Sequence, residues 1–313
     1  MKGLEIARAY YEEYGRPMLE EKFPQWLPYL AAGLTGSGSE CFGYDDAVSR
    51  DHDFEPGFCL FLQGEDMVDR RTAFLMERAY STLPGEYGGL KRSLLQPVGG
   101  ARKGVLRTAA FFQARTGSEG EELTWQQWLS IPEYALAEAV NGEIFFDHYG
   151  EVTRRRAGLA RYPEDIRRKK LAGNLLLMAQ SGQYNYLRCI CHGERAAAQL
   201  AVTEFARSTI NVLFLLNGRY QPYYKWTFRA LRALPRLSLL AELLEYLLTT
   251  DNDSGMYEEK YAVMEDMARD VTEELQRQEV TSAEEQDLER HAYSVNDSIR
   301  NPNLRNLHIL AAV

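Results

Sequence analysis

The sequence has few cysteines and no long apolar run, and each shortage excludes a class of protein. Four cysteines in 313 residues are too few for a disulfide-stapled fold of this length. The richest apolar stretch, residues 237–248, contains Glu242 and Glu245 and falls short of the roughly 20 apolar residues that a membrane span needs. The N-terminus lacks the charged-then-apolar run of a signal peptide. We therefore expect a cytoplasmic protein with no membrane partner.

Positive charge is also in short supply. The chain has 36 Lys+Arg against 45 Asp+Glu, a formal net charge of −9, which argues against duplex DNA as the main partner. Two basic runs, residues 154–156 and 167–170, stand out in this acidic background. They are either solvated helix faces or groups that neutralise phosphates, because arginine matches phosphate bidentately.

The composition is that of an ordinary globular protein, with 45% hydrophobic and 12% aromatic residues. Its length predicts about two domains. In the first half, apolar runs and turn residues predict mixed structure: helices over residues 4–21 and 66–80, and strands over residues 27–35, 54–62, 105–112 and 143–147.

The second half has a different pattern. Its apolar periodicity predicts consecutive helices over residues 164–180, 194–216, 222–233, 237–249 and 257–278. We therefore predict an α+β fold, with a domain of mixed sheet and flanking helices at residues 1–162 and an all-helical domain at residues 163–313.

The most informative segment is the stretch from Gly36 to Phe54. It combines an apolar strand, a Gly-Ser turn, a short helix and a second strand that opens with Asp-x-Asp. Phosphoryl and nucleotidyl transfer use such groups, because backbone amides of a glycine-rich turn cradle phosphate oxygens and carboxylates hold Mg²⁺.

Asp51 and Asp53 are two positions apart, which on a strand directs both side chains to one face and His52 to the other. Two carboxylates so close repel each other unless a cation lies between them. Two divalent ions about 4 Å apart would clamp both the attacking and the leaving oxygens. The alternative is a strand-entry turn in which aspartates cap backbone amides.

This segment resembles the DNA polymerase β-like nucleotidyltransferase superfamily, whose signature is Gly-Ser followed by Asp-x-Asp. Gly38-Ser39 with Gly43 is similar to the Gly-Ser-x-x-x-Gly of that superfamily, and Asp51 and Asp53 take the place of its metal-binding pair. More narrowly, the chain resembles a bacterial nucleotidyltransferase-like family of unassigned substrate in which a helical domain follows the catalytic one. Residues 142–147, 161–165 and 217–226 also look like that family.

The resemblance implies transfer of a nucleoside monophosphate from an NTP to an acceptor hydroxyl, with release of pyrophosphate. Gly38 and Ser39 would then contact the triphosphate, and Asp51 and Asp53 would bind two Mg²⁺ ions. The superfamily usually adds a third carboxylate on a later strand. Residues 105–112 contain no acid, so Glu143 and Asp147 are the candidates.

The acceptor and the base preference stay open, since a small molecule, a tRNA end and a protein hydroxyl are all compatible with the motif. The rival hypothesis is a non-catalytic nucleotide-binding or regulatory protein that keeps the fold without the full set of acids. The aromatic stretch at residues 220–226 contains Lys225. It is either a packing surface or a surface that stacks on a base with Lys225 near a phosphate.

Overall fold

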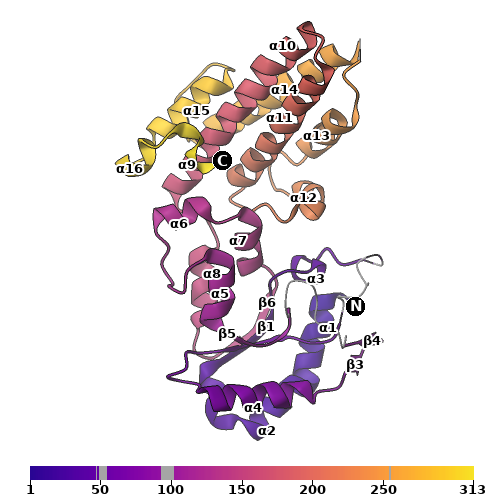
Figure 1. Ribbon diagram of the computed structural model, residues 1–313, viewed down its shortest axis with the longest axis vertical. Coiled ribbons are helices and arrows are strands. Elements are labelled where there is room, and N and C mark those ends of the chain that lie inside the picture. The colour runs from indigo at the N-terminus through magenta and orange to yellow at the C-terminus, as the bar shows by residue number, and fades with distance from the viewer. Residues whose placement is uncertain (47, 49–54, 93–101, 254) are drawn as a thin grey trace. The chain divides into compact units, whose positions relative to one another are not determined.

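The computed structural model describes residues 1–46, 48, 55–92, 102–253 and 255–313. These residues form two compact units (Figure 1). The first unit comprises Met1–Leu123 and Ile131–Ala160, and the second comprises Thr124–Ser130 and Arg161–Val313. The predicted division into a domain at residues 1–162 and a helical domain at residues 163–313 stays a prediction.

The first unit contains a four-stranded mixed sheet of order β5-β2-β1-β6. Central strand β1 pairs antiparallel with β2 and with β6, and β2 pairs parallel with β5. The strands are β1 Leu30–Leu34, β2 Cys59–Leu62, β5 Gly104–Arg107 and β6 Glu143–Asp147. A two-stranded ribbon is formed by β3 Glu86–Tyr87 and β4 Leu90–Lys91. This mixed sheet, with the helical second unit, confirms the predicted α+β class.

One face of the sheet forms a large aromatic core. Leu30 and Ala32 of β1 and Leu60 and Leu62 of β2 alternate toward this face, as period-2 alternation requires, and pack in one buried cluster. Helices cover this face (Figure 1): α1 Gly3–Tyr10, η1 Tyr11–Gly15, α2 Arg16–Lys22 and α4 Arg70–Ser81.

The opposite face is covered by a second set of helices (Figure 1). Phe61 of β2 meets Phe111 of α5 edge to face, with ring centroids 5.1 Å apart. Because residues of β1 and β2 are buried on both faces, the sequences of these strands are continuous apolar runs without polar alternation. The remaining elements of the unit are η2 Pro24–Tyr29, α3 Ser39–Phe42, α5 Thr108–Thr116, α7 Glu133–Val140 and α8 Glu151–Leu159.

The strand predicted over residues 105–112 is wrong in its second half. β5 ends at Arg107, whose guanidinium donates to the carbonyl oxygens of Gln63 at 2.6 Å and Val68 at 2.7 Å. The next residue, Thr108, begins α5 and donates its hydroxyl to the Leu62 carbonyl at 3.1 Å. These tertiary bonds end the strand inside an apolar run that has no turn residue.

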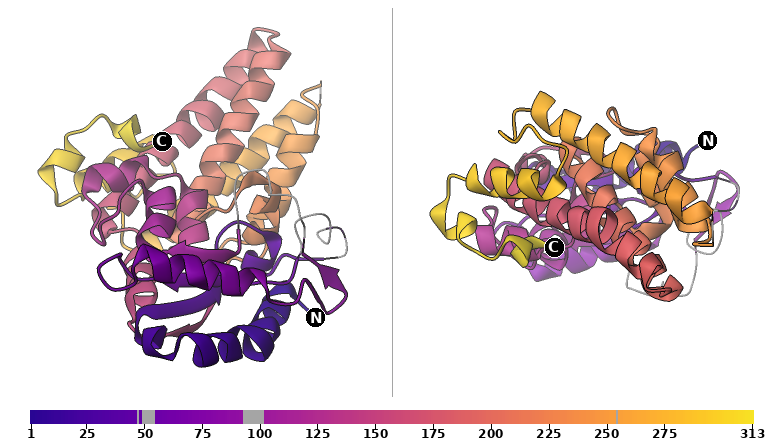
Figure 2. Two further views of the ribbon diagram at one scale, coloured as in Figure 1. Left: turned by 60° about the horizontal axis from the view of Figure 1, so that its bottom comes forward. Right: turned by 90° about the horizontal axis from the view of Figure 1, so that it is seen from above.

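Over its described residues, the regular elements of the second unit are all helices. Helix α9 packs between α11 and α15, and the C-terminal η4 also contacts α9 (Figure 2). The α-helices are α6 Trp125–Ser130, α9 Glu164–Met178, α10 Tyr186–Cys191, α11 Arg195–Leu216, α12 Tyr224–Leu231, α13 Leu240–Thr249, α14 Met256–Arg277, α15 Leu288–Asp297 and α16 Pro302–Arg305. The π-helical η3 spans Ala179–Asn185 and the 3₁₀ segment η4 spans Ile309–Ala312.

Across the part of the chain that the structure describes, no helix combines the length and the apolarity that crossing a membrane requires.

Candidate functional site

Four chain segments come together at one edge of the sheet. Register pairs Gly33 near the end of β1 with Cys59 at the start of β2. Cys59 in turn pairs with Gly104 at the start of β5, and Leu34 pairs with Glu143 at the start of β6. The Gly-Ser turn, which follows β1, therefore leaves the sheet beside the entry points of the three other strands. We call this region the turn edge.

The Gly-Ser turn has a backbone that glycine permits. Gly36 and Gly38 have φ values of 114° and 134°, where a side chain would strain the chain. Ser39 begins the one-turn helix α3, which ends at Gly43 with φ 71°. The Ser39 side chain is half-buried, and the carboxylate of Glu40 folds back over Gly38, so that a Cβ there would lie 2.6 Å from Glu40 Oε2.

Asn141 holds this turn against the entry of β6. Its Oδ1 accepts from the Gly36 amide at 2.9 Å, and its Nδ2 donates to the Gly36 carbonyl at 2.8 Å. Thr35 donates its hydroxyl to the Asn141 carbonyl at 2.9 Å. The side chain of Asn141 thus pairs with Gly36 as another strand would. The sequence interpretation missed this residue, although Asn141-Gly142 is a turn signal.

Glycine at position 142 is a steric requirement of this arrangement. A Cβ on Gly142, which has φ 66°, would lie 2.0 Å from the Leu34 carbonyl oxygen. The Gly142 amide also donates to the Cys41 carbonyl at 2.8 Å. The entry of β6 is therefore bonded to α3 as well as to β1.

A buried ion pair joins two further segments of the turn edge. Lys103 Nζ lies 3.5 Å from Glu40 Oε1, with both side chains less than a tenth exposed. The same ammonium donates to the Glu55 carbonyl at 2.5 Å. Lys103 directly precedes β5. It therefore connects the start of β5 both to α3 and to the segment that leads into β2.

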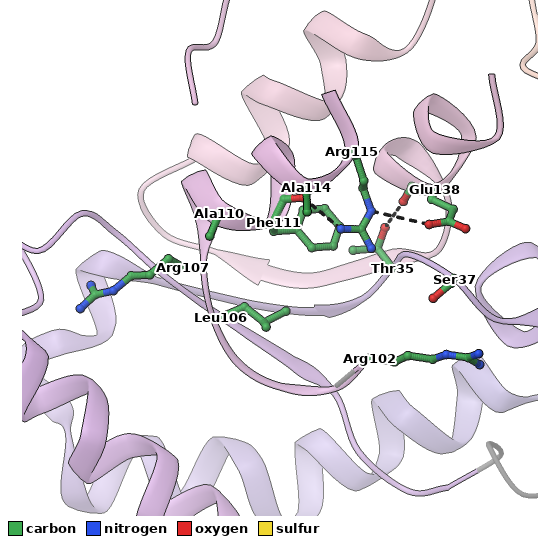
Figure 3. A pocket seen from close by; sticks show the side chains of 10 residues that line it. All are labelled: Thr35, Ser37, Arg102, Leu106, Arg107, Ala110, Phe111, Ala114, Arg115 and Glu138. Atoms are coloured by element: carbon green, nitrogen blue, oxygen red, sulfur yellow. Dashed lines mark hydrogen bonds and ion pairs between the residues drawn. The ribbon is translucent and has the colours of Figure 1, made fainter. Parts of the chain in front are cut away.

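A pocket of about 350 Å³ adjoins the turn edge on the face covered by α5 (Figure 3). Thr35 and Ser37 line it together with Arg102, Arg115 and Glu138. In Figure 3 the guanidinium of Arg107, another lining residue, points away from Arg115. Hydroxyl groups beside cationic side chains suit an anionic group in this pocket.

Arg115 and Glu138 form the charged wall of this pocket. The Arg115 guanidinium stacks 3.8 Å from the Phe111 ring centroid, and its Nε lies 3.9 Å from Glu138 Oε2. Burial lowers the pKa of Arg115 and raises the pKa of Glu138, and their attraction opposes both shifts. A Cβ on Gly36 would lie 2.6 Å from Arg115 Nη2, so this glycine admits the guanidinium beside the turn.

The structure separates the two predicted third acids. Glu143 lies at the turn edge and forms an ion pair with Arg8. Asp147 pairs with Ala31 near the other end of β1, about 13 Å away at the rise of a strand. Its carboxylate accepts from the backbone amides of Gly150 at 2.9 Å and Thr153 at 2.8 Å, where it caps the start of α8.

Of the other predicted residues, the structure describes Lys225 but not the Asp-x-Asp segment. Asp51, His52 and Asp53 lie outside the described residues. Lys225 is exposed on α12 in the second unit, with its ammonium 4.4 Å from the Trp226 ring centroid. Its contact with a nucleotide stays a prediction.

Of the two basic runs, residues 154–156 have partners within the first unit. Arg154 bonds Glu121 through two nitrogens, Arg155 pairs with Glu151, and Arg156 donates to the Val140 carbonyl. These groups hold α8 to its neighbours, which is a structural use of the run.

We tested whether the donor groups present at the turn edge fit a metal ion. Over the described ranges, no three side chains of His, Cys, Asp or Glu come together in a way that could hold one. Glu40 is paired with Lys103 and Glu143 with Arg8. The described carboxylates thus form no metal centre by themselves.

Two comparisons with known proteins find a similarity. Residues 128–227 match the family model described as Domain of unknown function (DUF4037). Among solved structures, a nucleotidyltransferase-like protein from Exiguobacterium sibiricum 255-15 matches with 12% identity and a TM-score of 0.36, over 85% of this chain and 75% of that chain. At this identity and score, the match gives no residue correspondence.

No curated protein matches the chain. The family match covers segments of both compact units, since it begins in α6 and ends in α12. The matched residues are less than half of the chain, so the match gives a similarity for this stretch alone.

Proposed function

We propose that the chain is a Mg²⁺-dependent nucleotidyltransferase that moves a nucleoside monophosphate from an NTP to an acceptor hydroxyl and releases pyrophosphate. The observation that carries the proposal is the antiparallel pairing of β1 with β2. It brings the end of β1, which leads into Gly38 and Ser39, beside the start of β2. Asp53 precedes this strand and is only two residues from Glu55, whose carbonyl accepts from Lys103 at the turn edge.

In this proposal each group at the turn edge has a separate task. Ser39 and the backbone of the Gly-Ser turn orient the triphosphate, and the cations beside the turn favour its negative charge. Asp51 and Asp53, the Asp-x-Asp pair that follows the Gly-Ser turn in the sequence, would hold the metal ions. Bound there, Mg²⁺ would neutralise charge that develops on the transferred phosphoryl group.

Glu143 is the residue that we propose as the third acid. It lies at the turn edge, whereas the Asp147 carboxylate is held by backbone amides at the opposite end of β6. A carboxylate within reach of the acceptor hydroxyl can take its proton as the oxygen attacks. Arg8 keeps Glu143 paired in the free protein, and this pair would have to open for that role.

The proposal is tested by incubating the protein with labelled NTPs, Mg²⁺ and a cell extract. We expect pyrophosphate release and a nucleotidylated species that mass spectrometry identifies. The double variant Asp51→Asn/Asp53→Asn should lose both, with an unchanged circular dichroism spectrum. Asp66→Asn removes an exposed carboxylate of the same unit and is the matched control.

Two results would contradict the transfer reaction. Nucleotide binding without pyrophosphate release would support a regulatory protein that keeps the fold. Pyrophosphate or phosphate release without any nucleotidylated product would indicate hydrolysis.

A further inference from the structure

The helical unit contains its own pocket, distinct in its residues from the turn edge. It has a volume of about 410 Å³ and lies where the end of α11 meets the start of α9 and the segment before α13. Four arginines line it, Arg161, Arg167, Arg219 and Arg236, against one acidic residue, Glu164. A local excess of guanidinium groups is unusual in a chain of net charge −9. We call this the arginine pocket.

The frame of the arginine pocket is fixed by side-chain amides. Asn217 Oδ1 accepts from the Arg236 amide at 3.0 Å, while its Nδ2 donates to the Leu213 carbonyl at 2.8 Å. Gln278 donates to the Leu216 carbonyl at 2.8 Å. These bonds attach the segments that carry Arg219 and Arg236 to the end of α11, so the walls are ordered before any ligand arrives.

Gly218 sets the direction in which the chain leaves α11. It has φ 59°, its amide donates to the Leu215 carbonyl at 3.2 Å, and the Arg219 amide donates to the Phe214 carbonyl at 3.0 Å. This is a Schellman ending, which requires a left-handed residue at this position. Arg219 therefore follows directly from a defined turn.

The four guanidinium groups divide into two kinds. Arg167 is bonded to Glu164 through two nitrogens at 2.9 and 2.8 Å, and Arg236 pairs with the buried Glu274 at 3.2 Å. The side chains of Arg161 and Arg219 are exposed, and within the described parts of the chain no hydrogen bond or ion pair engages them. Two cations are thus committed to the fold and two are available to a ligand.

We infer that the arginine pocket binds a small molecule that carries a phosphate or diphosphate group. Guanidinium groups present paired donors that match phosphate oxygens, and a volume of about 410 Å³ is typical of a small-ligand site. The acidic charge of the remaining chain disfavours a polynucleotide, which needs cations along an extended path. This inference does not depend on the transfer reaction proposed above.

The test is calorimetric titration of the full chain with inorganic pyrophosphate in the presence of EDTA. The double variant Arg161→Gln/Arg219→Gln should bind at least about tenfold more weakly, because charge-assisted hydrogen bonds are lost. The control Arg195→Gln/Arg207→Gln makes the same charge change at two exposed arginines of the same unit and should bind like the wild type. Arg161→Lys/Arg219→Lys should be intermediate, because it keeps the charge and loses the paired donors.

The inference is overturned if the wild type does not bind millimolar pyrophosphate, or if both glutamine double variants bind equally. The inference is also overturned, in favour of a nucleic-acid ligand, if a single-stranded oligonucleotide binds through Arg161 and Arg219 and pyrophosphate does not bind. Circular dichroism of each variant separates loss of binding from loss of folding.

Discussion

The side-chain amide of Asn141 bonds both backbone polar groups of Gly36, its Oδ1 at 2.9 Å from the amide and its Nδ2 at 2.8 Å from the carbonyl. Gly36 is buried, so no solvent replaces these bonds if the side chain is removed. The Gly-Ser turn therefore depends on a residue more than one hundred positions away.

Asn141→Ala should destabilise the first unit by about 2 kcal/mol, because it leaves a buried donor and a buried acceptor without partners. Asn141→Asp keeps the acceptor but sets a carboxylate oxygen against the Gly36 carbonyl oxygen, so its loss should be at least as large. Urea denaturation measures both, with Asn303→Ala at an exposed position as the control. A loss no larger than that of the control would show that Asn141 does not hold the turn.

Gly142→Ala should be far more damaging than another Gly→Ala change nearby. The new methyl group would lie 2.0 Å from the Leu34 carbonyl oxygen, on a backbone with φ 66°, and we expect a loss of at least about 3 kcal/mol. Gly158 on α8 has open space around it, so Gly158→Ala should be neutral or slightly stabilising. Comparable melting temperatures for the two variants would contradict the close approach of β6 to β1.

Substitution of the two acids of β6 should have different effects. Glu143→Gln should leave the melting temperature nearly unchanged, since its pair with Arg8 is exposed and such pairs contribute little. If Glu143 takes the acceptor proton, this variant should slow turnover by roughly 10²–10⁴-fold.

Asp147→Ala removes the acceptor for the amides of Gly150 and Thr153. It should cost about 1 kcal/mol as a lost helix cap, with turnover per folded molecule unchanged. If Asp147→Ala slowed turnover and Glu143→Gln instead lowered the melting temperature, Asp147 would be the acid.

The cysteines should react with iodoacetamide in a fixed order. Burial raises the pKa of the Cys59 thiol to about 11, so at pH 8 only on the order of 0.1% would be thiolate even with access. Burial also raises the pKa of Cys41, whereas Cys191 is exposed. Peptide mass spectrometry should find Cys191 labelled first and Cys41 and Cys59 labelled only in denaturant. Early labelling of Cys59 would contradict its place in the sheet.

Much of the fold could be predicted from local pattern. The strand at residues 143–147 and the long helices α9 and α11 follow from apolar periodicity and from Pro163 and Asn217-Gly218 at their ends. The switch from β5 to α5 could not be predicted, because bonds from Arg107 and Thr108 to residues far away in the sequence end the strand.

The candidate site was predicted only in its local part. Gly38 and Ser39 belong to one recognisable motif, and the structure brings them to the turn edge. The bond between Asn141 and Gly36 and the pair of Lys103 with Glu40 join residues more than sixty positions apart. Pairings of this kind carry no signature in a single sequence.

In the sheet that the described residues form, β1 has β2 on one side and β6 on the other. More than one hundred residues must therefore be synthesised after β1 before β6 exists. During that interval one backbone edge of a wholly apolar strand has no partner, which is the condition under which nascent chains aggregate or recruit chaperones. Slow translation, or a chain that stops before residue 143, should therefore cause this protein to accumulate in inclusion bodies, whatever reaction the finished molecule performs.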